Sequence, residues 1–241
     1  MKIALFSDTY IPDINGVATS TNILRNKLVN LGHDVLVVTS ELPSDTTYDE
    51  SLDDQVLRVP GLEIQALYGY RACNIFSFKG MKEIKRFNPE VIHVQTEFGI
   101  GYFSRIVAKK LNLPIVHTYH TLYEDYIHYV THGHFNNLAK KLAIKITKYY
   151  CEKKCDELIV PTDKIKDLFI NKYNISQPIN VIPTGIDIDK FKLTQNIKKE
   201  IENIKKKYKI KDTDFIIGSV GRIAPEKSFD KLLYNISKCY I

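Results

Sequence analysis

Two basic side chains near the end of the sequence have the types and the spacing of a diphosphate site. Arg222 and Lys227 follow Gly221, and an apolar run at residues 215–220 precedes that glycine. The run predicts a buried parallel strand, and open α/β sheets bind ligands at the carboxyl ends of such strands. Arginine offers a planar fork of donors and lysine a compact charge, so together they suit the oxygens of a diphosphate.

The loop that joins the first predicted strand to the first predicted helix is a second candidate for a phosphate-binding site. Gly16 stands where this loop, residues 7–16, enters the helix. A glycine there lets a ligand approach the backbone, while free amides and the helix dipole favour an anion. An ordinary turn with a helix cap explains the same residues, and the glycine triplet of dinucleotide-binding proteins is absent from the loop. The phosphate hypothesis therefore depends on the loop and the Gly221 segment together.

Histidines close a predicted strand at the same ligand-binding edge. In the run His117-Thr118-Tyr119-His120-Thr121, alternation places His117 and Tyr119 on one face of the sheet and His120 at the strand end. His120 is therefore the better candidate for contact with a substrate. A neutral or protonated imidazole there would bond a sugar or stabilise negative charge on a phosphate. Polar loop histidines without such a role are the alternative.

Two further groups have the residue types of a metal site without its spacing. His128, His132 and His134 follow the histidine run, and Cys151 and Cys155 stand one helical turn apart. No further ligand falls at a spacing that is typical of metal sites. We therefore predict no metal, no other cofactor and reduced thiols.

The elements that must position these residues alternate between short apolar runs and helical patterns. Such alternation predicts an α/β fold with a doubly wound parallel sheet and right-handed crossovers. A boundary in residues 183–194 separates a first domain, residues 1–190, from a linker and the start of a second domain, residues 191–241. The predicted strands are residues 3–6, 35–39, 56–59, 91–94, 115–119, 158–160 and 179–182, and the predicted helices are residues 17–31, 79–87, 99–111, 137–154, 163–172 and 196–209.

The charge of the chain narrows its expected partners. Among 241 residues the net charge is +6, and the basic excess is concentrated in residues 140–211. Because no nucleic-acid-binding motif accompanies this excess, phosphates and acidic lipid surfaces are preferred to nucleic acid as partners. The first residues lack the pattern of a signal peptide, and no apolar stretch reaches the length of a membrane span, so we expect a cytoplasmic protein.

Five segments, taken in order, resemble glycosyltransferase family 4 over nearly the whole chain. Two longer stretches that contain the first and third of these segments, DTYIPDINGVATS at residues 8–20 and HTYHTLYEDY at residues 117–126, most resemble bacterial diacylglycerol glucosyltransferases. The five segments are Asn15-Gly16-Val17, Gln95-Thr96-Glu97-Phe98, the run from His117 to Thr121, Val181-Ile182-Pro183-Thr184-Gly185-Ile186-Asp187, and the segment from Gly221 to Ser228.

This resemblance implies a GT-B architecture, in which two Rossmann-like domains face each other across a cleft. It also implies a retaining, metal-independent transfer of a hexose, expected to be glucose, from a UDP-sugar to a lipid acceptor such as diacylglycerol. It places Gly16 at the donor phosphates, His120 beside the transferred sugar, and Arg222 and Lys227 on the donor diphosphate. The expected location is cytoplasmic, peripheral on the inner face of the cell membrane.

The sequence departs from the family pattern at its end. Family members carry two glutamates, eight positions apart, deeper in the second domain, and this pair is absent before Ile241. We therefore expect negligible transferase activity from the chain alone, since complementarity to a transition state needs the full set of groups. The alternative is a non-catalytic fragment, or a subunit that needs a separate C-terminal chain. A nicotinamide-dependent oxidoreductase is disfavoured, because its glycine fingerprint is missing.

A basic helical stretch, residues 137–154, is the main candidate for lipid contact. Leu138, Leu142, Ile146 and Tyr149 form one stripe of this predicted helix, and lysines lie on the other faces. Such a helix would rest on an anionic lipid surface. The alternative is a stripe packed on the core with solvated lysines. Residues 68–87 mix aromatic and basic side chains and suit a lipid interface or a loop over the core equally.

Overall fold

A computed structural model of the protein describes the chain except residues 44, 50, 52–53, 64–70, 74–75, 123–135, 222, 224–226 and 239–241. At residues 62–63, 71–73, 136–139 and 153 it describes only the backbone. The chain forms two compact units, Met1–Asp187 and Ile188–Ile241.

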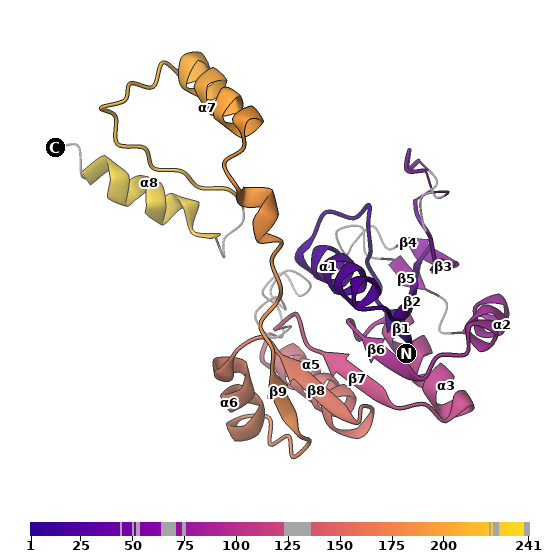
Figure 1. Cartoon of the computed structure of the whole chain (residues 1–241). Coiled ribbons are helices and arrows are strands. Elements are labelled where there is room, and N and C mark those ends of the chain that lie inside the picture. The colour runs from indigo at the N-terminus through magenta and orange to yellow at the C-terminus, as the bar shows by residue number, and fades with distance from the viewer. Residues whose placement is uncertain are drawn as a thin grey trace. The chain divides into compact units, whose positions relative to one another are not determined.

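A parallel sheet is the centre of the first unit (Figure 1). Its seven strands lie in the order β3-β2-β1-β6-β7-β8-β9, and each pairs with its neighbours in parallel. The strands are β1 (Lys2–Phe6), β2 (Asp34–Ser40), β3 (Val56–Val59), β6 (Val91–Val94), β7 (Ile115–Thr118), β8 (Glu157–Val160) and β9 (Ile179–Val181). The chain runs outward from β1 in one direction and then returns to place β6 on its other side. This order confirms the predicted doubly wound sheet and makes the carboxyl ends of β1 and β6 its switch point.

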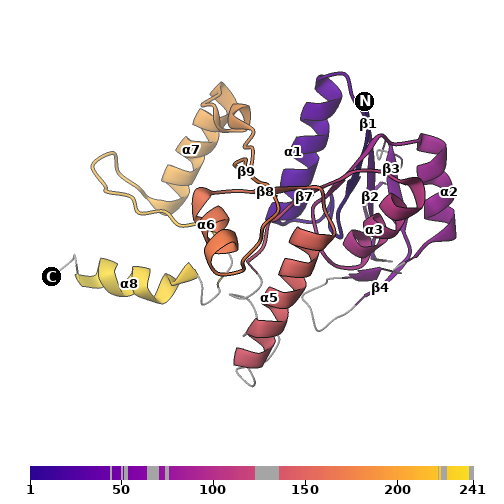
Figure 2. The same cartoon turned by 90° about the horizontal axis from the view of Figure 1, so that it is seen from below.

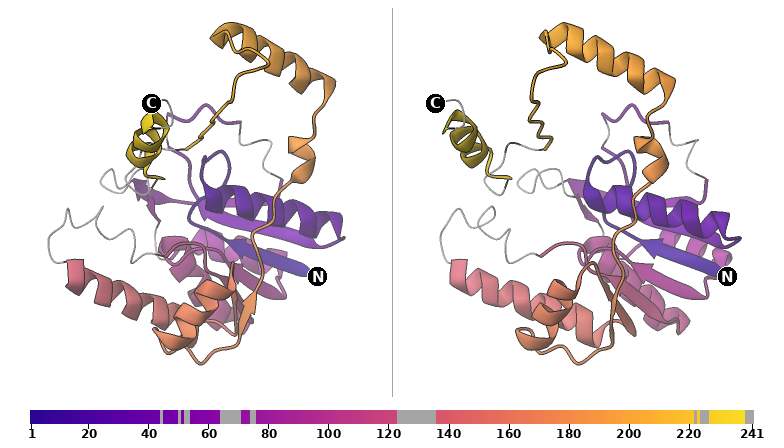
Figure 3. Two further views of the ribbon diagram at one scale, coloured as in Figure 1. Left: turned by 90° about the vertical axis from the view of Figure 1, so that its left-hand side faces the viewer. Right: turned by 60° about the vertical axis from the view of Figure 1, so that its left-hand side comes forward.

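Helices cover both faces of this sheet. Figures 2 and 3 show α1 (Gly16–Asn30) on one face and α3 (Gly99–Leu111) and α5 (Asn136–Lys153) on the other. The residues of β1 alternate accordingly: Ile3 and Leu5 belong to the core cluster on the α1 side, and Ala4 and Phe6 to the cluster beneath α3. This is the period of two that a strand buried on both faces imposes.

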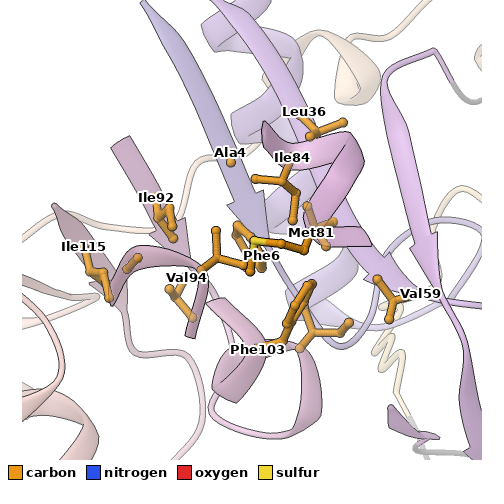
Figure 4. Close-up of a cluster of buried hydrophobic side chains, with 14 residues drawn as sticks. Ala4, Phe6, Leu36, Val59, Met81, Ile84, Ile92, Val94, Phe103 and Ile115 are labelled. Carbon is orange, nitrogen blue, oxygen red and sulfur yellow. The ribbon is translucent and has the colours of Figure 1, made fainter. Parts of the chain in front are cut away.

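The largest core cluster lies between β1, β2, β6 and the two helices α2 (Phe78–Phe87) and α3 (Figure 4). Phe6 and Phe103 meet edge to face, with ring centroids 6.2 Å apart. Helix α2 begins where the Ser77 hydroxyl accepts a hydrogen bond from a backbone amide, and it buries Met81 and Ile84 in this cluster. Of the described aromatic residues in the segment 68–87, Phe76 and Phe87 pack against this core, whereas Phe78 is 85% exposed.

Helix α5 turns a different face to the sheet from the one that its apolar stripe suggested. Ile144 and Cys151 pack into the second core cluster, beside β8 and α6 (Asp163–Asn171). Leu142, Ile146 and Tyr149 are 57%, 45% and 44% exposed. The alternative in which these three side chains pack on the core is therefore wrong. The side chain of residue 138, the fourth member of the stripe, lies outside the described residues.

Two short strands were missed by the sequence analysis. β4 (Gly61–Glu63) and β5 (Arg71–Cys73) pair in an antiparallel direction and form a separate two-stranded sheet. Three residues are too few to give a recognisable alternation of apolar and polar side chains. These two strands belong to a different sheet from β1 and β6, whose carboxyl ends form the switch point.

The second unit contains helical elements among its described residues: η3 (Ile188–Phe191), α7 (Gln195–Tyr208) and α8 (Phe229–Lys238). The prediction of a buried strand at residues 215–220 is wrong. These residues have no strand partner, and Phe215 and Val220 are 85% and 104% exposed. A parallel strand is formed only beside another strand, and the part of this unit that the structure describes has none.

Candidate functional site

Polar side chains gather at the carboxyl ends of β1, β6 and β7, at and beside the switch point of the sheet. All of them are buried, although their residue types usually prefer water. Burial of such groups is costly unless each is hydrogen-bonded, so the pattern of their bonds tells which of them hold the fold and which stay available. The buried polar residues at these strand ends are Ser7, Asp8, Thr9, Gln95, Thr96, Glu97 and His117.

Asp8 fills the N-terminus of α3. Its Oδ1 accepts a bond from the amide of Ile100 at 2.8 Å, and its Oδ2 accepts one from the Thr96 hydroxyl at 2.5 Å. Burial raises the pKa of this carboxyl above its usual value, although the bonds from Thr96 and Ile100 oppose the rise. Because the carboxylate already occupies the amide end of α3, a ligand phosphate would have to bind elsewhere.

Gly101, in the first turn of α3, allows this close junction with β6. A Cβ atom added at Gly101 would lie 2.0 Å from the carbonyl oxygen of Thr96. Only glycine fits a position where backbone approaches backbone so closely. Sequence reasoning passed over both Asp8 and Gly101, since a capping carboxylate from another strand leaves no local pattern.

The predicted phosphate loop reaches the open end of α1. Asn15 caps this helix, since its Oδ1 accepts a bond from the amide of Ala18 at 2.9 Å. Asn15 also donates to the Thr9 hydroxyl at 2.7 Å, and Thr9 donates to Asp13 at 2.5 Å, so the loop is held internally. Gly16 is exposed, and a Cβ atom added there would meet nothing within 4 Å. There is therefore open space beside Gly16, where the phosphate contact is predicted.

A buried chain of charged and polar groups links α3 to β6 through His117. Nη2 of Arg105 lies 3.3 Å from Nδ1 of His117, and Nε2 of His117 lies 2.9 Å from Oε1 of Glu97. A guanidinium can only donate, so Nδ1 accepts and Nε2 carries the proton that is donated to Glu97. Burial lowers the pKa of His117, which the bond to Glu97 opposes. The histidine is thus a neutral bridge between a fixed cation and a fixed anion.

His120 lies just past the end of β7, as predicted, and it is only partly buried. Its Nε2 is 2.8 Å from Oε1 of Gln95, at the end of β6. Desolvation lowers the pKa of His120 to about 4. Of the two forms that the sequence left open, the neutral imidazole is therefore the one present near pH 7. Such a group bonds hydroxyls and does not act as a cation toward a phosphate.

The other predicted site residues lie outside the described part of the first unit. Arg222 lies outside the described residues, as do His128, His132 and His134. Lys227 is exposed and belongs to the second unit, just before α8.

The cysteines of α5 and its C-terminal end do not form a metal site with other described residues. Cys151 and Cys155 are free thiols, and Sγ of Cys155 donates to the carbonyl oxygen of Cys151 at 3.0 Å. Within the described ranges no three His, Cys, Asp or Glu side chains come together as a metal site. In the same ranges no helix combines the length and the apolar composition that a membrane span requires.

Comparison with known proteins assigns the chain to a family. The model of Glycosyltransferase Family 4 matches residues 14–190. The chain is 37% identical to the alpha-monoglucosyldiacylglycerol synthase of Acholeplasma laidlawii, over all of this chain and 60% of that protein. It is 32% identical to the synthase of the same name from Streptococcus pneumoniae, over 97% of this chain and 51% of that protein. The chain thus spans half to three fifths of the length of these relatives.

A solved structure shows the same fold. A chain of sucrose-phosphate synthase from Thermosynechococcus elongatus matches with a TM-score of 0.50 and 14% identity, over 86% of this chain and 99% of that chain. The doubly wound first unit is thus a Rossmann-like domain of the kind that GT-B glycosyltransferases carry. From the family match and the relatives together, the chain belongs to glycosyltransferase family 4.

Proposed function

We propose that the chain is the acceptor-side part of a retaining transferase that passes glucose from UDP-glucose to diacylglycerol. The observation that carries this proposal is the 37% identity over the whole chain to a protein named alpha-monoglucosyldiacylglycerol synthase. In the proposed reaction the acceptor hydroxyl oxygen bonds to C1 of glucose, and the bond from C1 to the diphosphate oxygen breaks. UDP leaves with that electron pair, and the proton of the hydroxyl is released.

His120 is proposed to contact the transferred sugar. It lies at the switch-point edge, where open α/β sheets bind their ligands, and it is partly accessible. Its Nε2 is bonded to Gln95, so the neutral imidazole would accept a hydrogen bond from a sugar hydroxyl at Nδ1. Gln95 and Glu97, which sequence reasoning had assigned no role, lie beside it and fix the polar character of this edge.

The donor diphosphate is proposed to bind at Gly16, Arg222 and Lys227. Open space at the N-terminus of α1 supports the first of these contacts. Arg222 and Lys227 supply the cations that would offset charge growing on the departing diphosphate, so the proposal invokes no metal.

The acceptor is proposed to arrive from an anionic membrane surface along α5. The apolar stripe of Leu142, Ile146 and Tyr149 faces solvent, and the exposed lysines Lys141 and Lys145 stand among its members. An exposed apolar stripe flanked by cations is the arrangement of a helix that lies in a lipid interface. Under this proposal the protein is cytoplasmic and peripheral.

The second candidate function is a non-catalytic subunit that needs a separate C-terminal chain. It is favoured by the exposed apolar run at residues 215–220, which would pair with strands of another chain.

One assay tests both candidates. The purified chain is incubated with radiolabelled UDP-glucose and diacylglycerol in mixed micelles, alone and with the remaining C-terminal part of the Acholeplasma laidlawii relative added as a separate protein. We expect no glucolipid from the chain alone and glucolipid from the mixture. Glucolipid from the chain alone would remove the subunit alternative. The absence of product from the mixture, when the full-length relative is active in the same micelles, would contradict the proposed reaction.

A further inference from the structure

Gln95 is a buried side chain that uses only part of its hydrogen-bonding capacity. It is 2% exposed, and its Oε1 lies 2.8 Å from Nε2 of His120. Its Nε2 is buried and has no hydrogen-bond partner among the residues that the structure describes. A buried amide nitrogen left in this state is costly, so its retention at a ligand-binding edge calls for an explanation.

The neighbours of Gln95 show that this open donor is not a general feature of the strand end. Thr96, the next residue, is bonded to Asp8, and Glu97 is bonded to His117. The backbone amide of Gln95 donates to the carbonyl oxygen of Phe6 at 2.8 Å, which fixes the residue at the switch point. Gln95 therefore holds a buried donor that has no partner among the described residues, on a backbone that is hydrogen-bonded to β1.

The bond to His120 sets the state of the imidazole. An amide oxygen can only accept, so Nε2 of His120 carries the proton and Nδ1 keeps a lone pair. If the amide of Gln95 is turned over, its nitrogen bonds His120 and its oxygen becomes the open atom. In either orientation one polar atom of Gln95 holds His120 and the other is left for a ligand.

We propose that Gln95 is a substrate-binding residue, whose open amide nitrogen donates a hydrogen bond to a hydroxyl of the hexose beside His120. Its other amide atom holds the imidazole of His120 in one tautomer and orientation. This inference rests on the proposed function, because the hexose is the sugar of that reaction. It adds to that function a contact at the end of β6, from a residue that motif reasoning did not select.

The test uses nuclear magnetic resonance of the whole 241-residue chain labelled with 15N. The side-chain NH2 signals of Gln95 are assigned by comparison with Gln95→Met and followed during titration with UDP-glucose, glucose 1-phosphate and UDP. We expect the two sugar-bearing ligands to shift the Gln95 signals and UDP to leave them in place. Backbone shifts elsewhere in the chain while the Gln95 signals stay fixed would overturn the inference alone. No response anywhere to either sugar ligand would count against the proposed function and the inference together.

Two substitutions separate binding from structure. Gln95→Glu keeps an acceptor for His120 but removes the open donor, so we expect about a tenfold loss of affinity for glucose 1-phosphate. It should leave the protonated Nε2 of His120 visible in the 15N spectrum. Gln95→Met should lose the affinity and also the single tautomer, with a melting temperature that is unchanged or raised. Gln55→Glu, at an exposed position, is the matched control and should bind as the parent does. A lowered melting temperature for Gln95→Met with unchanged affinity would mean that Gln95 serves only the fold.

Discussion

Glu97 and His117 are joined by a 2.9 Å hydrogen bond beneath the carboxyl edge of the sheet, and both side chains are buried. Arg105 bonds the other nitrogen of the same imidazole, so a cation and an anion face each other through a neutral ring. Removing the charge at one end of such a buried chain leaves the other end uncompensated.

The substitution Glu97→Gln tests this arrangement. The glutamine can still accept from Nε2 of His117, but the charge of Arg105 loses its counter-charge. We expect the free energy of unfolding to fall by about 3 kcal/mol, measured by urea denaturation. The control is Glu83→Gln, which breaks a pair between a partly buried carboxylate and the exposed Arg86 and should cost less than about 1 kcal/mol. Equal losses in the two variants would contradict a buried charge pair.

Two glycines at helix starts should respond differently to the same substitution. In Gly101→Ala the new Cβ atom would overlap the carbonyl oxygen of Thr96, so α3 must shift from β6. We expect a loss of about 3 kcal/mol or more in unfolding free energy. In Gly16→Ala the Cβ atom has open space, so stability should change by less than about 1 kcal/mol.

Thermal and urea unfolding of both alanine variants give the comparison. If Gly16→Ala keeps its stability but loses affinity for UDP-glucose, the proposed phosphate contact gains support. A stable Gly101→Ala protein would show that the junction of α3 and β6 is looser than the geometry indicates.

Three histidines with lowered pKa values, His93, His117 and His120, should make the first unit sensitive to acid. Desolvation lowers the pKa of His93 to about 3 and that of His120 to about 4, from an ordinary value of 6.5. A folded-state pKa below the unfolded one means that the unfolded chain binds more protons below pH 6.5. The free energy of unfolding is therefore not reduced by these histidines above that pH. As the pH falls toward 4 it decreases by about 1.4 kcal/mol per pH unit for each histidine.

The measurement is the unfolding free energy of the parent and of His93→Asn between pH 4.5 and pH 8. The parent should show the steeper slope below pH 6.5, and the two slopes should coincide above pH 7. The raised pKa of Asp8 acts in the opposite direction in both proteins and cancels in this comparison. Parallel slopes throughout would mean that His93 titrates normally in the folded protein.

The exposed stripe of α5 should determine binding to lipid vesicles. We expect the double substitution Leu142→Ser with Ile146→Ser to weaken binding to phosphatidylglycerol vesicles by about tenfold, because two partly inserted side chains are lost. The control is Leu31→Ser with Ile170→Ser, two exposed apolar residues at the C-cap of α1 and on α6. Co-sedimentation at low and at high salt separates the apolar contribution from the charge contribution. Equal binding by both double variants would exclude α5 as the lipid contact.

The sequence located most elements of the first unit, because a strand buried on both faces leaves an apolar run that needs no tertiary information. Val91–Val94 and Val56–Val59 were predicted with their observed bounds. The same rule was wrong at residues 215–220, where an apolar run finds no neighbouring strand in the described structure. Composition records that a segment is suited to burial, and pairing decides whether it becomes a strand.

Sequence determined the family, the alternation of strands and helices, and the position of His120 at a strand end, because these depend on residues close together in the chain. Only the tertiary structure showed that Asp8 caps α3 and that the side chains of Arg105, His117 and Glu97 are linked by hydrogen bonds. It also decided that the stripe of α5 faces outward and that the buried amide nitrogen of Gln95 has no partner among the described residues. These relationships join residues from different strands and helices, and hydrogen bonds between such distant segments leave no spacing for a sequence to reveal.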